Sequence, residues 1–385
     1  MAFDIVEKEL AKRPPSIIAL VDYIIERAVA RRASDIHFEP VVEGLRTRLR
    51  IDGVLEDAHL LPLSVRDEVV ARLKVRAGLR TDEHHAAQDG RFRHGSTGRI
   101  EVDVRVSIAP TYHGENAVLR LLAENAGNHT LETLGFTEAN REKITDALKR
   151  ASGMILATGP TGSGKTTTLY TLIQSLNSRE RSIVTIEDPI EYAIEGVRHM
   201  QVHARAGLTF ATGLRTILRQ DPDVIMVGEI RDIETAGIAV NTALSGHLLL
   251  SSLHTSDAPT TLPRLLDMKI EAFLVASTIS LVIGQRLVRM VCAHCKEKVL
   301  MDGEIFFQGK GCADCGGSGY TGRIGIHEVL VATDELRAAI LERKAARDLR
   351  RIAIAQGMRT LHEDGLEKAR SGITSRAEVF RIAHE

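Results

Sequence analysis

The sequence predicts an α/β protein in which a doubly wound domain follows a smaller α/β domain. After residue 150, short apolar runs alternate with helical patterns, as in folds with a parallel sheet. Before residue 123, two segments alternate strictly between apolar and polar residues, as half-buried strands do. The chain has 385 residues, of which 44% are hydrophobic, so it can bury two or three separate cores. The expected parts are an arm at 1–15, the smaller domain at 16–122, a linker at 123–130, the doubly wound domain at 131–285, a cysteine-containing segment at 286–325 and a helical tail at 326–385.

The smaller domain is expected to begin with an amphipathic helix and to continue with strands that carry arginine. Apolar residues recur at helical spacing over 16–33. Three strands are expected after this helix, at 45–51, 100–108 and 117–122. Their polar positions hold several arginines, among them Arg105 and Arg120. Taken alone, such arginines are ordinarily explained by a sheet face in contact with solvent.

The doubly wound domain is predicted from short apolar runs that alternate with helical segments. A helix is expected at 138–151 and another from Lys165. The buried strands are expected at 154–157, 182–186, 223–227 and 247–251. Because continuous apolar runs are typical of strands covered on both faces, we expect a parallel sheet.

The turn between the strand at 154–157 and the next helix matches the phosphate-binding pattern G-x-x-x-x-G-K-[ST]. Its glycines let backbone N–H groups turn towards phosphate oxygens, and the helix N-terminus adds its positive dipole end. Lys165 is expected to reach the β and γ phosphates of ATP, and Thr166 is expected to bind Mg²⁺. A nucleotide-binding switch without hydrolysis remains an alternative. We assign nucleotide binding to Gly159, Pro160, Thr161, Gly162, Ser163, Gly164, Lys165, Thr166 and Thr167.

Hydrolysis also requires a carboxylate that orients or activates water, and two acidic segments follow predicted strands. The strand at 223–227 leads into Gly228 and Glu229, where an aspartate would be usual at the glycine. Direct Mg²⁺ ligation is therefore less favoured, and Glu229 is expected to act through a metal-bound water. The strand at 182–186 ends at the carboxyl edge of the sheet, where ligands bind in such folds. An acidic box follows it, with Glu187, Asp188 and Glu191, although composition alone is equally consistent with a solvated turn.

All four cysteines lie in two C-x2-C pairs, Cys292 with Cys295 and Cys312 with Cys315, separated by sixteen residues. This spacing is typical of a tetrahedral zinc site. Four thiolates leave no coordination position open for a substrate, so we expect a structural Zn²⁺. The clustering also indicates a reducing compartment, and free thiols or disulfides are the less favoured alternative.

Charge and targeting signals narrow the class of protein further. The 50 Lys and Arg nearly balance the 51 Asp and Glu, so no basic excess indicates a nucleic-acid partner. The N-terminal residues lack the basic segment and apolar run of a secretory signal. The apolar stretch at 270–285 is interrupted by serine and threonine and is shorter than the ~20 residues that span a bilayer. We expect a cytoplasmic protein that meets a membrane only through partners.

An ordered set of motifs between residues 16 and 383 identifies a family. Ser34-Asp-Ile-His-Phe-Glu39 and Gln88-Asp-Gly-Arg91 precede the phosphate loop. The acidic box at 186–192, the segment at 218–232, the histidine box at 246–255 and the cysteine pairs follow it. With these motifs the chain resembles the secretion ATPases of the type II secretion and type IV pilus-assembly family. The resemblance implies a RecA-like P-loop NTPase core, a PAS-like N-terminal domain, a zinc-binding insertion and a helical C-terminal tail.

The resemblance also implies catalytic roles for the two acidic segments. Glu191 would activate the attacking water, with Glu187 and Asp188 in the same box. Glu229 would belong to the Mg²⁺ shell, and a glycine before it is normal in the family.

Histidines and arginines receive roles from the same resemblance. His247 and His254 would relay the state of the γ-phosphate to the rest of the assembly. Arg105 and Arg120 would reach the phosphates from the N-terminal domain, which replaces the solvated-face explanation. A planar guanidinium suits the charge of a phosphoryl group in transfer. A further pair of arginines, Arg215 and Arg219, would serve the neighbouring site.

The family further implies an assembly and its partners. These are a homohexameric ring that rotates as ATP is consumed, an inner-membrane platform protein and a cytoplasmic docking protein, so that the chain would lie peripherally at the inner membrane. The cysteines favour secretion or pilus extension, because retraction motors of the family generally lack them. The leading hypothesis is that the chain is the motor of a type II secretion system. The alternative is a motor for type IV pilus extension or a DNA-uptake filament, and less favoured ones are a non-hydrolysing scaffold and a nucleic-acid translocase.

Overall fold

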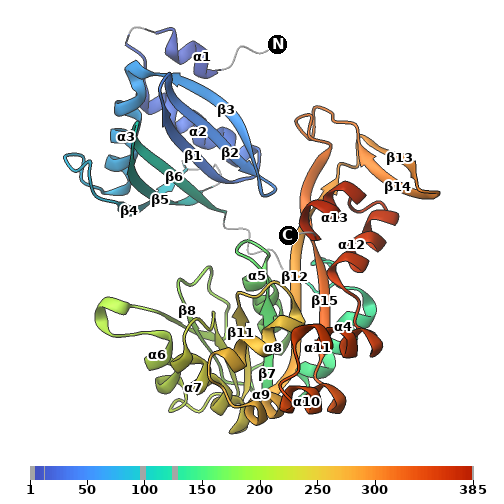
Figure 1. Cartoon of the computed structure of the whole chain (residues 1–385). Helices are drawn as coiled ribbons and strands as arrows, with labels where there is room; N and C mark the ends of the chain where they lie inside the picture. The colour runs from blue at the N-terminus through green and yellow to red at the C-terminus, as the bar shows by residue number, and fades with distance from the viewer. Residues whose placement is uncertain (1–4, 13, 96–100, 124–128, 384–385) are drawn as a thin grey trace. The chain divides into compact units, whose positions relative to one another are not determined.

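The computed structural model describes residues 5–12, 14–95, 101–123 and 129–383. The chain forms two compact units, 1–126 and 127–385 (Figure 1). Most of the linker predicted at 123–130 lies outside the described residues, as do parts of the arm predicted at 1–15 and the first residue of the strand predicted at 100–108. Each unit has its own sheet and its own core.

The N-terminal unit is a six-stranded antiparallel sheet with the strand order β3-β2-β1-β6-β5-β4. The helix and the three strands predicted from the sequence are confirmed as α2, β2, β5 and β6. The elements are α1 (Ile5–Leu10), α2 (Ile17–Ala30), β1 (Ala33–Val41), β2 (Gly44–Ile51), β3 (Val54–Pro62), α3 (Leu63–Ala77), β4 (Gln88–His94), β5 (Val102–Thr111) and β6 (Gly114–Ala123).

Alternation along the strands separates the two faces of this sheet. In β5, Val104 and Val106 are buried in one cluster with Leu20 and Ile24 of α2 and with residues of α3. Arg105 lies between these valines and therefore belongs to the opposite face. The helices thus cover the apolar face, and the arginines lie on the other one.

The C-terminal unit is built on a seven-stranded sheet with the order β15-β12-β7-β11-β10-β8-β9. All neighbours in it are parallel except β15, which runs antiparallel to β12. The strands of this unit, including a separate two-stranded hairpin of β13 and β14, are β7 (Gly153–Thr158), β8 (Ile183–Glu187), β9 (Val197–Gln201), β10 (Val224–Val227), β11 (Leu248–Leu253), β12 (Ile279–Val291), β13 (Lys296–Met301), β14 (Glu304–Gly309) and β15 (Tyr320–Val331).

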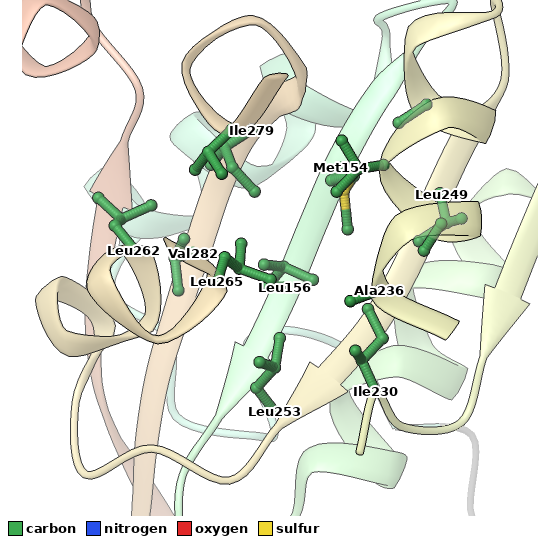
Figure 2. Close-up of a cluster of buried hydrophobic side chains, with 14 of the residues drawn as sticks. Met154, Leu156, Ile230, Ala236, Leu249, Leu253, Leu262, Leu265, Ile279 and Val282 are labelled. Atoms are coloured by element: carbon green, nitrogen blue, oxygen red, sulfur yellow. The ribbon is translucent and has the colours of Figure 1, made fainter. Parts of the chain in front are cut away.

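Helices pack on both faces of this sheet. Met154 and Leu156 of β7 face one cluster together with Leu262 and Leu265 (Figure 2). The intervening residues of β7 face a second cluster, which holds side chains of α4 and α5. The four predicted strands are confirmed as β7, β8, β10 and β11. The helices are α4 (Glu138–Leu148), α5 (Lys165–Leu176), α6 (Phe210–Ile217), α7 (Ile233–Leu244), α8 (Ala258–Asp267), α9 (Ala272–Thr278), α10 (Asp334–Leu341), α11 (Ala346–Ala355), α12 (Leu361–Arg370) and α13 (Arg376–Ala383).

The structure corrects the division of the C-terminal unit. The predicted boundaries at 285/286 and 325/326 fall inside β12 and β15, which pair from Leu281 to Val291 of β12. The cysteine-containing segment is therefore an excursion from the main sheet, with the β13–β14 hairpin between its two cysteine pairs. The apolar pattern did not reveal β12 as a strand because polar residues interrupt it where it leaves the core. The helical tail is confirmed as α10 to α13, and no helix among the described residues is long and apolar enough to cross a bilayer.

Candidate functional site

The phosphate loop, Gly159 to Thr166, connects the carboxyl end of β7 to α5 in the middle of the sheet. Gly164 begins the helix with a left-handed φ of 87°. A Cβ on Gly159 would lie 2.4 Å from the carbonyl oxygen of Gln285. Gly164 is thus required by its backbone conformation, and Gly159 is required by the close approach of the Gln285 backbone.

Lys165 lies buried at the start of α5. Its ammonium donates hydrogen bonds to the carbonyl oxygens of Gly159 at 2.8 Å and Pro160 at 3.0 Å. Burial lowers the pKa of Lys165 to about 8, although the nearby Glu229 carboxylate opposes this. The site therefore holds a cation that gains from an anionic ligand.

Gln285 of β12 contacts the phosphate loop and the first turn of α5. The sequence did not predict this residue as part of the site. Its amide donates to the carbonyl oxygen of Ser163 at 2.7 Å and its oxygen accepts from the Thr168 hydroxyl at 2.9 Å. Gln285 is 2% exposed. The signal that could have revealed it is a glutamine inside the apolar segment that follows Ile279.

Glu229 lies just past β10 and is engaged by two neighbours. One carboxylate oxygen is 2.6 Å from Arg231, and the other is 3.1 Å from Nε2 of His254, which follows β11. The ion pair with Glu229 raises the pKa of Arg231. A Cβ on Gly228 would lie 3.3 Å from the carbonyl oxygen of Ile186, so the close approach of β8 favours glycine over aspartate there.

The acidic box divides into exposed and buried carboxylates. Asp188 and Glu191 are exposed. Glu187, at the end of β8, is only 2% exposed and accepts hydrogen bonds from Tyr170 and Thr185. It follows that Glu187 has little access to a water that attacks a nucleotide.

His247 lies at the opposite end of β11 from His254, and the second arginine pair has partners of its own on α6 and α7. His247 precedes β11, whereas His254 follows it, so the strand separates them by its whole length. Arg215 of α6 pairs with Glu234 of α7 at 2.7 Å. The Arg219 guanidinium donates to the Arg215 carbonyl oxygen at 3.0 Å.

The arginines of the N-terminal unit form a row across its sheet. Arg91, Arg105 and Arg120 lie directly opposite one another on β4, β5 and β6, and Asp35 of β1 continues the row. Directly opposed residues of antiparallel strands share a face. Asp35 is 5% exposed and accepts a hydrogen bond of 3.0 Å from Arg120. These residues line a cavity of about 640 Å³ on this unit.

The four cysteine sulfurs lie together, all within 4.8 Å of one another. The sulfur of Cys292 is 3.8 Å from that of Cys312, and the sulfur of Cys295 is 3.9 Å from that of Cys315. The sulfurs of Cys312 and Cys315 are 3.6 Å apart. Four sulfurs around one tetrahedral Zn²⁺ would be about 3.8 Å apart, whereas a disulfide requires about 2 Å. The thiolates therefore fit zinc. Burial raises the pKa of Cys315, but hydrogen bonds from the backbone N–H groups of Cys312 and Gly319 outweigh it and lower the pKa to about 6.

Residues 11–381 match the family described as type II/IV secretion system protein. The chain belongs to this secretion family.

Members of the family from several bacteria are similar to the chain over nearly its whole length. The type II secretion system ATPase E of Vibrio cholerae is 45% identical over 96% of this chain and 76% of its own length. The type IV pilus assembly ATPase PilB of Thermus thermophilus is 42% identical over 99% of this chain, which spans only 45% of that protein.

Solved structures support the fold. An ATPase from Legionella pneumophila, DotB, superimposes with a TM-score of 0.72 at 24% identity over 95% of both chains. The pilus retraction motor PilT, solved with bound ADP, superimposes with a TM-score of 0.62 at 26% identity over 94% of this chain and 97% of its own.

In this member of the secretion family, the carboxyl edge of the C-terminal sheet gathers most of the predicted residues of that unit. The phosphate loop, the acidic box, Glu229 and His254 all follow the carboxyl ends of parallel strands. His247 is at the amino end of β11. Sequence reasoning did not find Tyr170, Gln285 or Arg231, which contact these residues.

Proposed function

We propose that the chain is the ATP-hydrolysing motor of a type II secretion system, which powers assembly of a pseudopilus and export of proteins through an inner-membrane platform. The observation that supports this most directly is the buried Lys165 ammonium. Among the described residues, its hydrogen bonds go to the carbonyl oxygens of Gly159 and Pro160, and burial lowers its pKa to about 8. A triphosphate offers it a stronger, charged partner.

The residues around the loop have separate tasks in this proposal. Lys165 and the loop N–H groups bind the β and γ phosphates. The exposed Thr166 hydroxyl and Glu229 would hold Mg²⁺, which neutralises phosphate charge. Glu191 orients and activates the attacking water. His254, bonded to Glu229, responds to changes there.

Two substitutions separate binding from hydrolysis. Glu191→Gln should lower kcat on the order of 100-fold or more, because it removes the base, while nucleotide Kd stays within about twofold. Lys165→Ala should weaken nucleotide binding on the order of 100-fold, because a buried charge-assisted contact is lost. Phosphate release and nucleotide titration measure these effects. Rapid release by Glu191→Gln would contradict the assignment of the base, and a wild-type chain that binds no Mg-ATP would overturn the function.

The arginine row supplies a second test. Arg105→Ala or Arg120→Ala should slow turnover on the order of 100-fold without unfolding the chain, since a planar cation stabilises phosphoryl charge in the transition state. Arg46→Ala, which removes an exposed arginine from the same sheet, is the matched control. Wild-type turnover in both row variants would remove the arginines from the mechanism.

The proposed partners are further copies of this chain, an inner-membrane platform protein and a cytoplasmic docking protein. We propose a cytoplasmic homohexamer, peripheral at the inner membrane, in which Arg215 and Arg219 serve the neighbouring site and His247 joins His254 in relaying the phosphate state. Specific ATPase activity should then rise with protein concentration. Activity that stays constant on dilution, with a single-chain mass, would contradict the ring.

A motor for pilus extension or DNA uptake is the second candidate, because the pilus ATPases PilB are 42% and 43% identical to this chain, close to the value for the secretion ATPases. Complementation of strains that lack either ATPase distinguishes the two. Turnover stimulated by DNA at moderate salt would instead indicate a translocase.

A further inference from the structure

The buried Glu187 carboxylate organises two side chains around itself. One oxygen accepts a hydrogen bond from the Tyr170 hydroxyl. The other accepts from the Thr185 hydroxyl at 2.6 Å and lies 2.8 Å from Nδ1 of His199. These partners and the 2% exposure favour an anchoring role for the Glu187 carboxylate over that of a base towards water.

The hydrogen bonds define the tautomer of His199. The N–H of Ile194 donates to Nε2 of His199 at 3.1 Å, so this nitrogen carries no proton. Nδ1 therefore carries the proton and donates it to Glu187. His199 thus connects the buried carboxylate of β8 to the backbone of the segment that follows it.

Tyr170 connects the same carboxylate to the same segment at another point. Its hydroxyl accepts a hydrogen bond of 3.4 Å from the N–H of Glu191. Its ring packs edge to face on Tyr192, with 4.6 Å between ring centroids. Tyr170 is fully buried in α5, the helix that begins with Lys165.

We infer that Tyr170 and His199, anchored by Glu187, are positioning residues that hold the backbone of residues 191–194 and so aim the Glu191 carboxylate at the γ-phosphate. This inference rests on the proposed function, in which Glu191 activates water. The Glu191 side chain is exposed on an irregular segment, so its position depends on how the backbone of that segment is held. A displacement of about 1 Å in a reacting group can cost about 100-fold in rate. The buried side chains of Tyr170 and His199 contact this segment at Glu191, Tyr192 and Ile194, and these contacts restrict that displacement.

Tyr170→Phe tests the inference, because it keeps the ring and removes only the hydroxyl. In the full-length chain, kcat should fall about tenfold, while KM and the nucleotide Kd stay within about twofold. His199→Asn, which keeps a donor for Glu187 and loses the acceptor for Ile194, should show the same split. Tyr320→Phe is the control, because it removes a phenol hydrogen bond of 2.6 Å to Ser375 elsewhere in this unit and should leave kcat unchanged.

A purely structural role would lower the melting temperature and leave kcat per folded molecule intact, and that result would overturn the inference. Combination with Glu191→Gln provides a second readout in single-turnover experiments. Since Tyr170 acts through Glu191, Tyr170→Phe should cost less than about twofold in that background. An independent tenfold loss there would also overturn the inference. If Glu191→Gln alone retains wild-type turnover, the proposed function fails at Glu191, whereas wild-type turnover of Tyr170→Phe beside an inactive Glu191→Gln refutes the positioning role only.

Discussion

The phosphate loop and the turn at residues 312–319 of the cysteine segment are both glycine-rich turns of the C-terminal unit, but they use their polar groups in opposite ways. In the cysteine segment, the N–H groups of Cys312 and Gly319 donate to the Cys315 sulfur at 3.1 and 3.2 Å. In the phosphate loop, the Lys165 ammonium rests on neutral carbonyl oxygens. The first arrangement stabilises the Cys315 thiolate, as the proposed structural zinc site requires. The second leaves a cation whose partners a ligand can replace, as turnover requires.

Removal of the metal should produce the largest effect and leave the phosphate loop intact. Cys312→Ser combined with Cys315→Ser should abolish zinc binding, which is worth about 10 kcal/mol in structural sites. Residues 292–319 should then lose protection in hydrogen exchange, while nucleotide affinity changes less than about twofold. Elemental analysis of the wild-type chain should find one zinc per chain. A metal-free wild-type chain with the same exchange protection would contradict the zinc site.

Nucleotide affinity should depend on pH through Lys165. Since its pKa is about 8 before a ligand binds, the ammonium is mostly charged at pH 7 and mostly neutral at pH 9. Phosphates favour the charged form, so binding at pH 9 must take up a proton, and Kd should rise about tenfold between pH 7 and pH 9. Calorimetry in buffers of different ionisation enthalpy measures the proton uptake.

Lys165→Arg is the matched control, because guanidinium stays charged over this range. Whatever affinity it retains should vary little with pH. An equally steep pH dependence in this variant would show that another group titrates.

Alanine substitution of one glycine in each turn should have the smallest effect, and it compares the two turns directly. Gly164 and Gly317 have φ angles of 87° and 85°, so alanine should cost about 1 kcal/mol of unfolding free energy at either position. A Cβ at Gly317 meets nothing within 4 Å, whereas one at Gly164 lies 3.2 Å from the Gln285 amide. Only Gly164→Ala should therefore weaken nucleotide binding. Thermal unfolding and nucleotide titration of both variants test this, and equal loss of affinity would contradict it.

Local patterns were sufficient for much of the structure. The alternation around Arg105 predicted β5 and its charged face, and the glycine-rich turn before Lys165 predicted the strand and helix on either side of it. The spacing of the cysteines predicted that the four sulfurs would meet, as they do. In each case the determining residues are close in sequence.

What could not be predicted depends on contacts between distant residues. Gln285 reaches Ser163 across 122 positions of the chain, and Glu187 meets Tyr170 across 17. The sequence places Glu187 near Glu191 as a similar acid. Only the folded chain shows that Glu187 is buried beside Tyr170 of α5 while Glu191 is exposed. The long strand β12 was missed because its apolar half pairs with β7 and its polar half continues beside β15.

Asp35 gives Arg120 of the arginine row an anionic partner within the N-terminal unit. The Nε of the Arg120 guanidinium donates a hydrogen bond to the Asp35 carboxylate, so in the proposed mechanism a phosphate would compete with this carboxylate for the arginine. Competition from Asp35 would lower the net attraction of Arg120 for a phosphate. If Arg120 binds phosphate as proposed, Asp35 supplies a carboxylate to which its guanidinium can return each time phosphate leaves.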